Sequence, residues 1–172
     1  MHEIKHPTTL NPQLLDLLFA HKGSVSTIFS DVLGLLNLDH IAIAYLNHKQ
    51  QLTIFSSTPS LEFNLFNSPL WRLDKTYRPS WYTSCGQASW QELYTRSHYD
   101  QLYHVKQNIP GYHRTISFAV KQEENYLVYS FASHSQQPIT KEIFAQQHEQ
   151  LLKIGQYCTK GLLPLFGDYG SW

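Results

Sequence analysis

Large aromatic side chains in an irregular stretch of the chain are the residues best suited to hold a ligand. Residues 67–84 contain two Pro, two Trp and two Tyr, and show no regular periodicity. Rings of this size must be buried against another part of the chain. Arg72, Arg78 and Arg96 lie among them and are suited to hold a carboxylate or phosphate of a ligand. Two interpretations stay open: the rings line a ligand pocket, or they close the core themselves with the arginines stacked outside.

Aromatic residues of this stretch, of the segment after it and of the predicted strands form the candidate ligand-binding set. The set is Tyr45, Trp71, Tyr77, Trp81, Tyr82, Trp90, Tyr94, Phe118 and Tyr129. The spacing of Trp90 and Tyr94 is also common in amphipathic helices, so packing in the core is the favoured interpretation for those two.

Histidines near acidic residues are the next candidates for chemistry. His98, His104 and His113 lie near Glu92 and Asp100 in the sequence. Two metal-binding histidines on one helix need a spacing that places them on the same face, and a separation of six residues does not. We therefore expect exposed or packing histidines, no metal ion and no cofactor.

Two cysteines complete the reactive groups. Cys85 lies between Ser84 and Gly86 in a predicted loop, and a nucleophilic cysteine would need a nearby base, which the sequence does not show. Cys158 falls on an apolar helix face and is expected to be buried. We predict no catalytic residue, and a small Cys-dependent enzyme using Cys85 and a histidine is kept as an alternative.

Helical periodicity dominates both ends of the chain. Asn11-Pro12 is suited to start a first helix and Gly23 to end it, and a second helix follows. A long helix is predicted after Thr140, with Leu151 and Cys158 on its apolar face, ending at Pro164 and Gly167. The segment 87–107 is also predicted to be helical.

Between these helices, the apolar residues alternate with a period of two. Ile41, Ile43 and Tyr45 alternate with alanines, and residues 51–57 alternate again after a turn, which predicts a hairpin with small side chains on one face. Residues 116–120 and 126–133 predict a second hairpin, whose last strand is apolar enough to be covered on both sides.

Two hairpins flanked by helices indicate the fold class α/β (α+β), with an antiparallel sheet of the GAF or PAS kind. We expect one sensor-like domain over residues 1–172. Its parts are N-terminal helices in 1–37, the sheet and aromatic segment in 38–137, and a C-terminal helix in 138–166.

Composition limits the classes of partner. Lys plus Arg equals Asp plus Glu, giving a formal net charge of +0, which argues against nucleic-acid binding by this chain alone. No apolar stretch approaches the length of a membrane span, and no cysteine spacing indicates disulfides or metal, so we expect a cytoplasmic protein without membrane contact. The lack of net charge favours self-association.

Three strings, in this order and spacing, resemble the sensor half of LuxR-type bacterial transcription regulators. They are Leu38-Asp39-His40-Ile41 with Phe55-Ser56-Ser57-Thr58-Pro59, His113 to Val120 with Asn125-Tyr126 and Phe131-Ala132-Ser133, and His148-Glu149-Gln150-Leu151-Leu152 with Gly155-Gln156-Tyr157. The resemblance spans most of residues 35–163 and implies a GAF-like sensor fold. Such regulators end in a helix-turn-helix domain, and we expect this chain to lack one. The lactone sensors of the superfamily also carry an acidic anchor, whose corresponding positions here are Tyr103 and His104, so lactone binding is not implied.

The resulting hypothesis is a non-enzymatic signalling domain for a small ligand or a partner protein. Its expected partners are a small molecule and a second copy or a full-length regulator, contacted through the first and last helices. The alternative is a protein-interaction module, secreted effector or adaptor that keeps the fold without a ligand pocket.

Overall fold

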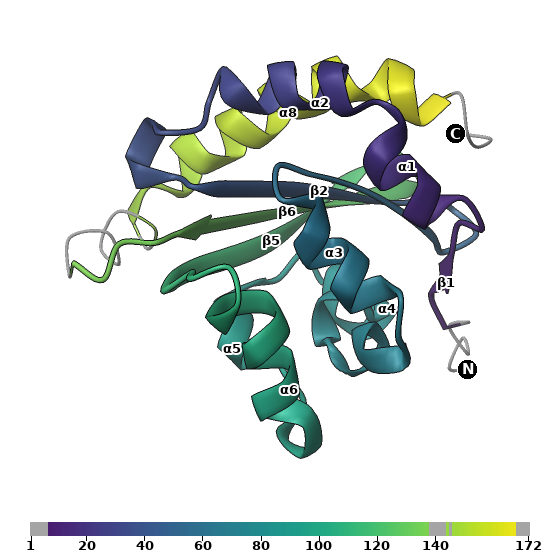
Figure 1. Ribbon diagram of the computed structural model, residues 1–172. Helices are drawn as coiled ribbons and strands as arrows, with labels where there is room; N and C mark the ends of the chain where they lie inside the picture. The colour runs from purple at the N-terminus through teal and green to yellow at the C-terminus, as the bar shows by residue number, and fades with distance from the viewer. Residues whose placement is uncertain (1–6, 138–143, 145, 168–172) are drawn as a thin grey trace.

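A mixed six-stranded sheet runs through the middle of the molecule in the computed structural model, which describes residues 7–137, 144 and 146–167 (Figure 1). The strand order is β1-β3-β2-β6-β5-β4, and all neighbouring pairs are antiparallel except β1 with β3. The strands are β1 (Thr9–Leu10), β2 (His40–Leu46), β3 (Gln51–Ser56), β4 (Gln87–Ala88), β5 (Arg114–Gln122) and β6 (Asn125–Ser133).

The α/β fold and the two hairpins are confirmed. The hairpins β2–β3 and β5–β6 join edge to edge through β2 and β6, whose register runs from His40↔Ala132 to Leu46↔Tyr126. The sheet is mixed rather than purely antiparallel, because β1 adds a parallel strand at one edge and β4 adds a short strand at the other. Two-residue strands are too short for their alternation to show in a sequence.

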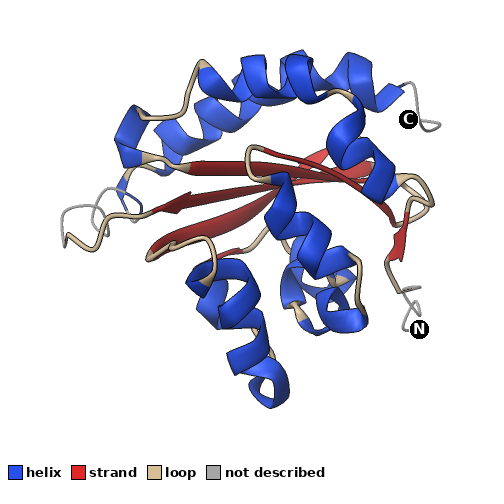
Figure 2. Cartoon of the chain, in the orientation of Figure 1, coloured by secondary structure: helices blue, strands red, loops and turns tan. Residues whose placement is uncertain are grey.

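The alternation along β2 separates two apolar cores, one on each face of the sheet. Ile41, Ile43 and Tyr45 face a core formed with helices α2 and α8, while Ala42 and Ala44 face a core formed with α1, α3 and the aromatic segment. The small alanines leave room above the sheet for large rings. Figure 2 shows these helices on the two sides of the strands.

Helices at the N-terminus differ from the prediction at their junction. Gly23 lies in the first turn of α2 instead of ending α1, and the last residue of α1 is Ala20. The longer α-helices are α1 (Leu14–Ala20), α2 (Lys22–Ser30), α3 (Pro59–Phe66) and α8 (His148–Gly167).

Residues 69–108 form a series of short helical turns. The segment 87–107, predicted to be helical, is divided into short helical turns, because Ser89, Tyr94 and Thr95 have extended backbone conformations and Tyr94 pairs with Asp74 in a β-bridge. The turns are η1 (Leu35–Asn37) before β2, and then η2 (Pro69–Leu73), η3 (Lys75–Tyr77), α4 (Pro79–Tyr82), α5 (Trp90–Leu93), η4 (Arg96–His98), α6 (Tyr99–Tyr103) and η5 (His104–Asn108).

The long C-terminal helix is present as α8. Thr140, its predicted cap, lies outside the described residues. Pro164 lies inside α8 rather than ending it, and α8 is described as far as Gly167. No helix in the described part of the chain is long and apolar enough to cross a bilayer.

Candidate functional site

The aromatic segment is held in short turns by local caps. The Ser68 hydroxyl accepts a hydrogen bond from the Leu70 backbone N–H, and the Asp74 carboxylate accepts one from the Thr76 N–H. Prolines at the first turn of η2 and of α4 fix the backbone where no helical donor is needed. These caps place Trp71 and Tyr77 over the alanine face of the sheet.

A cavity of about 550 Å³ opens between this segment and the N-terminal strand, and its size lies in the range of small-molecule sites. Its lining residues are Pro7, Thr8, Thr9, Trp71, Arg72, Asp74, Tyr77, Arg78, Pro79 and Ser80. Thr8 fixes the N-terminal wall, because its hydroxyl donates a hydrogen bond of 2.6 Å to the Tyr77 carbonyl.

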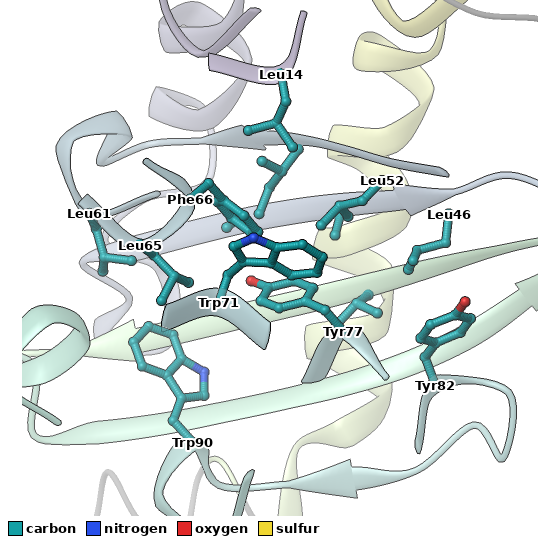
Figure 3. Packing of buried hydrophobic residues seen from close by; sticks show 14 of the residues in the cluster. Leu14, Leu46, Leu52, Leu61, Leu65, Phe66, Trp71, Tyr77, Tyr82 and Trp90 are labelled. Carbon is teal, nitrogen blue, oxygen red and sulfur yellow. The ribbon is translucent and has the colours of Figure 1, made fainter. Parts of the chain in front are cut away.

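Aromatic rings form the floor of the cavity. The Phe66 ring packs against both Trp71 and Tyr77, with centroid distances of 6.0 and 5.1 Å. Figure 3 shows the Trp71 and Tyr77 rings lying next to each other, with Leu52 and Phe66 close by. Trp71 and Tyr77 are both almost fully buried, so the rings themselves are fixed in place.

A buried ion pair lies behind this floor. The Lys106 ammonium is 2.6 Å from Asp74 Oδ2, while Asp74 Oδ1 accepts hydrogen bonds from the backbone and hydroxyl of Thr76. The ammonium also lies over the rings of Trp90 and Tyr94, at 4.6 and 5.6 Å from their centroids. Both carboxylate oxygens of Asp74 are therefore occupied by groups of the chain itself.

The π-helical turn η5 explains how a lysine reaches this position. The Ile109 N–H bonds to the His104 carbonyl, five residues back, and the wider turn allows the consecutive residues Lys106 and Gln107 both to be buried. The Gln107 side chain accepts a hydrogen bond of 2.7 Å from the Tyr94 hydroxyl. Burial, and the nearby charge of Asp74, raise the pKa of Tyr94 far above its ordinary value.

A second buried polar pair lies on the same face of the sheet. His40 Nε2 is 3.6 Å from Glu62 Oε1, and His40 Nδ1 is 3.0 Å from the Thr58 hydroxyl. Burial, helped by the positive charge of Lys106, lowers the pKa of His40 to about 3. Burial raises the pKa of Glu62 to about 7, so the glutamate is mostly protonated only below neutral pH.

The structure divides the predicted ligand-binding residues into three groups. Trp71 and Tyr77 line the cavity. Tyr82, Trp90 and Tyr94 are buried in the same core without lining it, and Trp81 is half-buried against that core.

Tyr45, Phe118 and Tyr129 lie on the opposite face of the sheet. Their side chains pack with Phe29 of α2 and with Leu151 of α8, so the structure does not bring them together with the other six. The prediction placed all nine side chains around one pocket. Neighbouring side chains of a strand point to opposite faces of the sheet, so Tyr45 lies on the face opposite Ala44.

The two buried polar pairs were missed by the sequence analysis. Tyr103 and His104, which correspond to the acidic anchor of the lactone sensors, are not acidic. Asp74 is a buried acidic residue inside the aromatic segment. A signal did exist for Asp74, because Asp followed two residues later by Thr is typical of a capped turn. No such signal marks Lys106, since its burial depends on a π-helical turn.

Cys85 and the histidines considered as its partners are not paired in the part of the chain that the structure describes. Cys85 is exposed, and among the described residues its thiol makes no hydrogen bond to a histidine. Of the three histidines considered, His104 bonds to Asn108, His113 to Gln136 and His98 to Ser97. In the part of the chain that the structure describes, no three His, Cys, Asp or Glu side chains form a metal-binding group.

The α/β fold of this chain is similar to a fold seen in solved structures. The solved structures of SdiA, a LuxR-type autoinducer-binding regulator, show the similarity. SdiA in complex with octanoyl-rac-glycerol has a TM-score of 0.60 and 15% identity over 89% of this chain. Escherichia coli SdiA in the space group P6522 has a TM-score of 0.56 and 14% identity over 92% of this chain.

This chain spans 64% and 68% of the lengths of those two SdiA chains. No protein-family model matches the sequence, and no curated protein matches it. The similarity at this identity concerns the fold.

Proposed function

We propose that this chain is a non-enzymatic sensor domain that binds a small amphiphilic ligand in the cavity between Trp71, Tyr77 and the N-terminal strand. The observation that carries the proposal is the cavity itself, which has about 550 Å³ of space over a floor of fixed aromatic rings. A core that closed its own centre would leave no such space, and would favour the protein-interaction module instead.

The similarity in fold supports a ligand with an acyl chain. SdiA, whose fold this chain shares, was solved in complex with octanoyl-rac-glycerol. An apolar chain would lie against the rings of Trp71 and Tyr77, where burial of its surface gives most of the binding free energy.

The proposed signalling step is a shift between two arrangements of the helices. A ligand changes such an equilibrium only by binding one arrangement more tightly than the other. We propose that residues 1–172 act as one domain in the bacterial cytoplasm, pairing with a second copy or with a full-length regulator. The ligand would then change dimerisation or a partner's binding to DNA.

The test is thermal unfolding with octanoyl-rac-glycerol, compared between the wild type and two tryptophan variants. At a concentration of about 100 times Kd, a ligand specific for the folded state adds about 2.7 kcal/mol to the free energy of unfolding. Trp71→Ala should abolish this gain, because it removes the cavity floor. Trp81→Ala, half-buried and outside the lining, is the matched control and should keep it.

Native mass spectrometry of the protein from its own host is the second measurement. A retained small molecule that is lost in Trp71→Ala would support the proposal. If no ligand is retained and no acyl compound stabilises the wild type, the sensor function is wrong and the interaction module is favoured.

A further inference from the structure

The cavity combines an apolar floor with a basic rim. Three charged residues line it, namely Arg72, Asp74 and Arg78. The charge of Asp74 is already balanced by Lys106, at 2.6 Å, and the carboxylate is fully buried. Among the described residues that line the cavity, the two guanidinium groups therefore determine the charge that a ligand meets at the entrance.

Contacts within the segment hold both guanidinium groups at this rim. The Arg72 Cζ atom lies 5.6 Å from the centre of the Trp71 ring, which forms the floor of the same cavity. Arg78 Nη2 donates a hydrogen bond of 3.3 Å to the Arg72 carbonyl. Two positive groups six residues apart in the sequence are thus held at the rim of the cavity, beside its aromatic floor.

Neither arginine has an acidic partner in the part of the chain that the structure describes. The ion pairs among those residues are His40–Glu62 and Lys106–Asp74. An arginine pair without a carboxylate, beside an apolar cavity, is complementary to a carboxylate because each guanidinium can donate two parallel hydrogen bonds to it.

We infer that the ligand is an amphiphile with a carboxylate head, which binds Arg72 and Arg78 at the rim while its acyl chain lies against Trp71 and Tyr77. This inference rests on the proposed function and makes it more specific. Asp74 already accepts hydrogen bonds from Thr76 and from Lys106, so the head is recognised through the two arginines, as an anion.

The experiment compares octanoate with octanoyl-rac-glycerol by isothermal titration calorimetry at pH 7.5, at concentrations below micelle formation. Octanoate carries the charge, and octanoyl-rac-glycerol carries the same acyl chain with a neutral head. The proteins are the wild type, Arg72→Gln, Arg78→Gln and the control Arg96→Gln, whose exposed arginine does not line the cavity.

Octanoate should bind more tightly than octanoyl-rac-glycerol, and each rim variant should weaken octanoate about tenfold, the loss of one charge-assisted hydrogen bond. The affinity of octanoyl-rac-glycerol should change little in the same variants, and Arg96→Gln should change neither ligand. Added salt should weaken octanoate selectively, because the rim is open to solvent.

Two results would overturn the inference in distinguishable ways. Tighter binding of octanoyl-rac-glycerol, with octanoate insensitive to both rim variants, would leave the sensor function intact and show that the head is neutral. Absence of binding by both compounds, with no molecule retained in native mass spectrometry, would remove the sensor function together with this inference.

Discussion

At the scale of single residues, Glu62 and His40 lie side by side in the interior, where burial shifts their pKa values in opposite directions. Burial raises the pKa of Glu62 from 4.5 to about 7 and lowers the pKa of His40 from 6.5 to about 3. Both shifts favour the neutral form, as expected where water is excluded. The ammonium of Lys106 is the fixed charge nearby, and it acts on both groups.

Ionisation of the buried Glu62 side chain lowers the free energy of unfolding as the pH rises. We predict that Glu62→Gln removes this pH-dependent loss of stability. The folded state holds the Glu62 proton up to about pH 7, whereas the unfolded chain releases it near pH 4.5. The stability from this group is therefore complete below pH 4.5 and lost as pH rises through 7. A difference of this size in pKa corresponds to about 3 kcal/mol.

Urea unfolding of the wild type and Glu62→Gln at pH 4.5, 6 and 7.5 checks this prediction. The stability of the wild type relative to the variant should fall by about 3 kcal/mol across the range. His40 contributes an opposite slope below pH 6.5, where its folded form resists protonation, and the comparison at each pH cancels that slope. A difference between the two proteins that stays constant with pH would contradict the prediction.

At the scale of elements, the sequence predicted the strands and hairpins, because these follow from the periodicity of apolar residues. Both hairpins follow from strict alternation, and the small face of β2 follows from Ala42 and Ala44. The sequence did not predict the breaks within residues 87–107. The apolar spacing of this segment also fits a chain of short turns, and its breaks are set by contacts with β5 and with Asp74. The cavity rim was predictable from Arg72 and Arg78, whereas the buried pairs depend on long-range packing.

Helix α8 packs closely on the sheet at Gly155, where we predict that a single methyl group destabilises the fold. A Cβ atom at Gly155 would lie 2.8 Å from the Tyr129 ring. That ring is buried and packed edge-on against Phe118, so it has no room to move. Gly155→Ala should cost about 1–3 kcal/mol in the free energy of unfolding, despite the better helix propensity of alanine.

Gly161→Ala is the matched control in the same helix. Its Cβ atom would meet the Ile28 side chain, at 3.0 Å from Cδ1 and 3.1 Å from Cγ1, and Ile28 is only partly buried and can shift. Thermal unfolding of both variants should show a lower midpoint for Gly155→Ala and little change for Gly161→Ala. Equal midpoints would mean that α8 can lift from the sheet at no cost.

At the scale of the whole molecule, the apolar faces of helices α1 and α8 are buried in the two cores. Leu14 and Leu18 of α1 pack into one core, and Leu151 and Cys158 of α8 pack into the other. The proposed dimer through these helices must therefore use the few large apolar groups that remain exposed on this part of the molecule. They are Phe19 on α1, Leu35 before β2 and Tyr157 on α8.

Tyr157 is the sharpest probe of such a dimer, because it is 53% exposed and its hydroxyl donates a hydrogen bond to Asp31, next to α2. We predict that Tyr157→Lys converts the dimer to a monomer, since a lysine ammonium would have to be desolvated in the interface. Asn108→Lys adds the same charge at an exposed position in η5 and is the control. Light scattering after size exclusion gives the mass of each protein.

Measuring at pH 5.5 as well as pH 7.2 separates a specific dimer from association caused by lack of charge. The sequence pI is about 7.2, so the net charge of the protein becomes positive as the pH falls to 5.5. Association from weak repulsion should disappear at pH 5.5 in all three proteins, whereas a dimer that uses Tyr157 should persist there in the wild type and in Asn108→Lys. A wild type that is monomeric at both pH values would exclude the homodimer and leave pairing with a different regulator as the remaining form of the proposal.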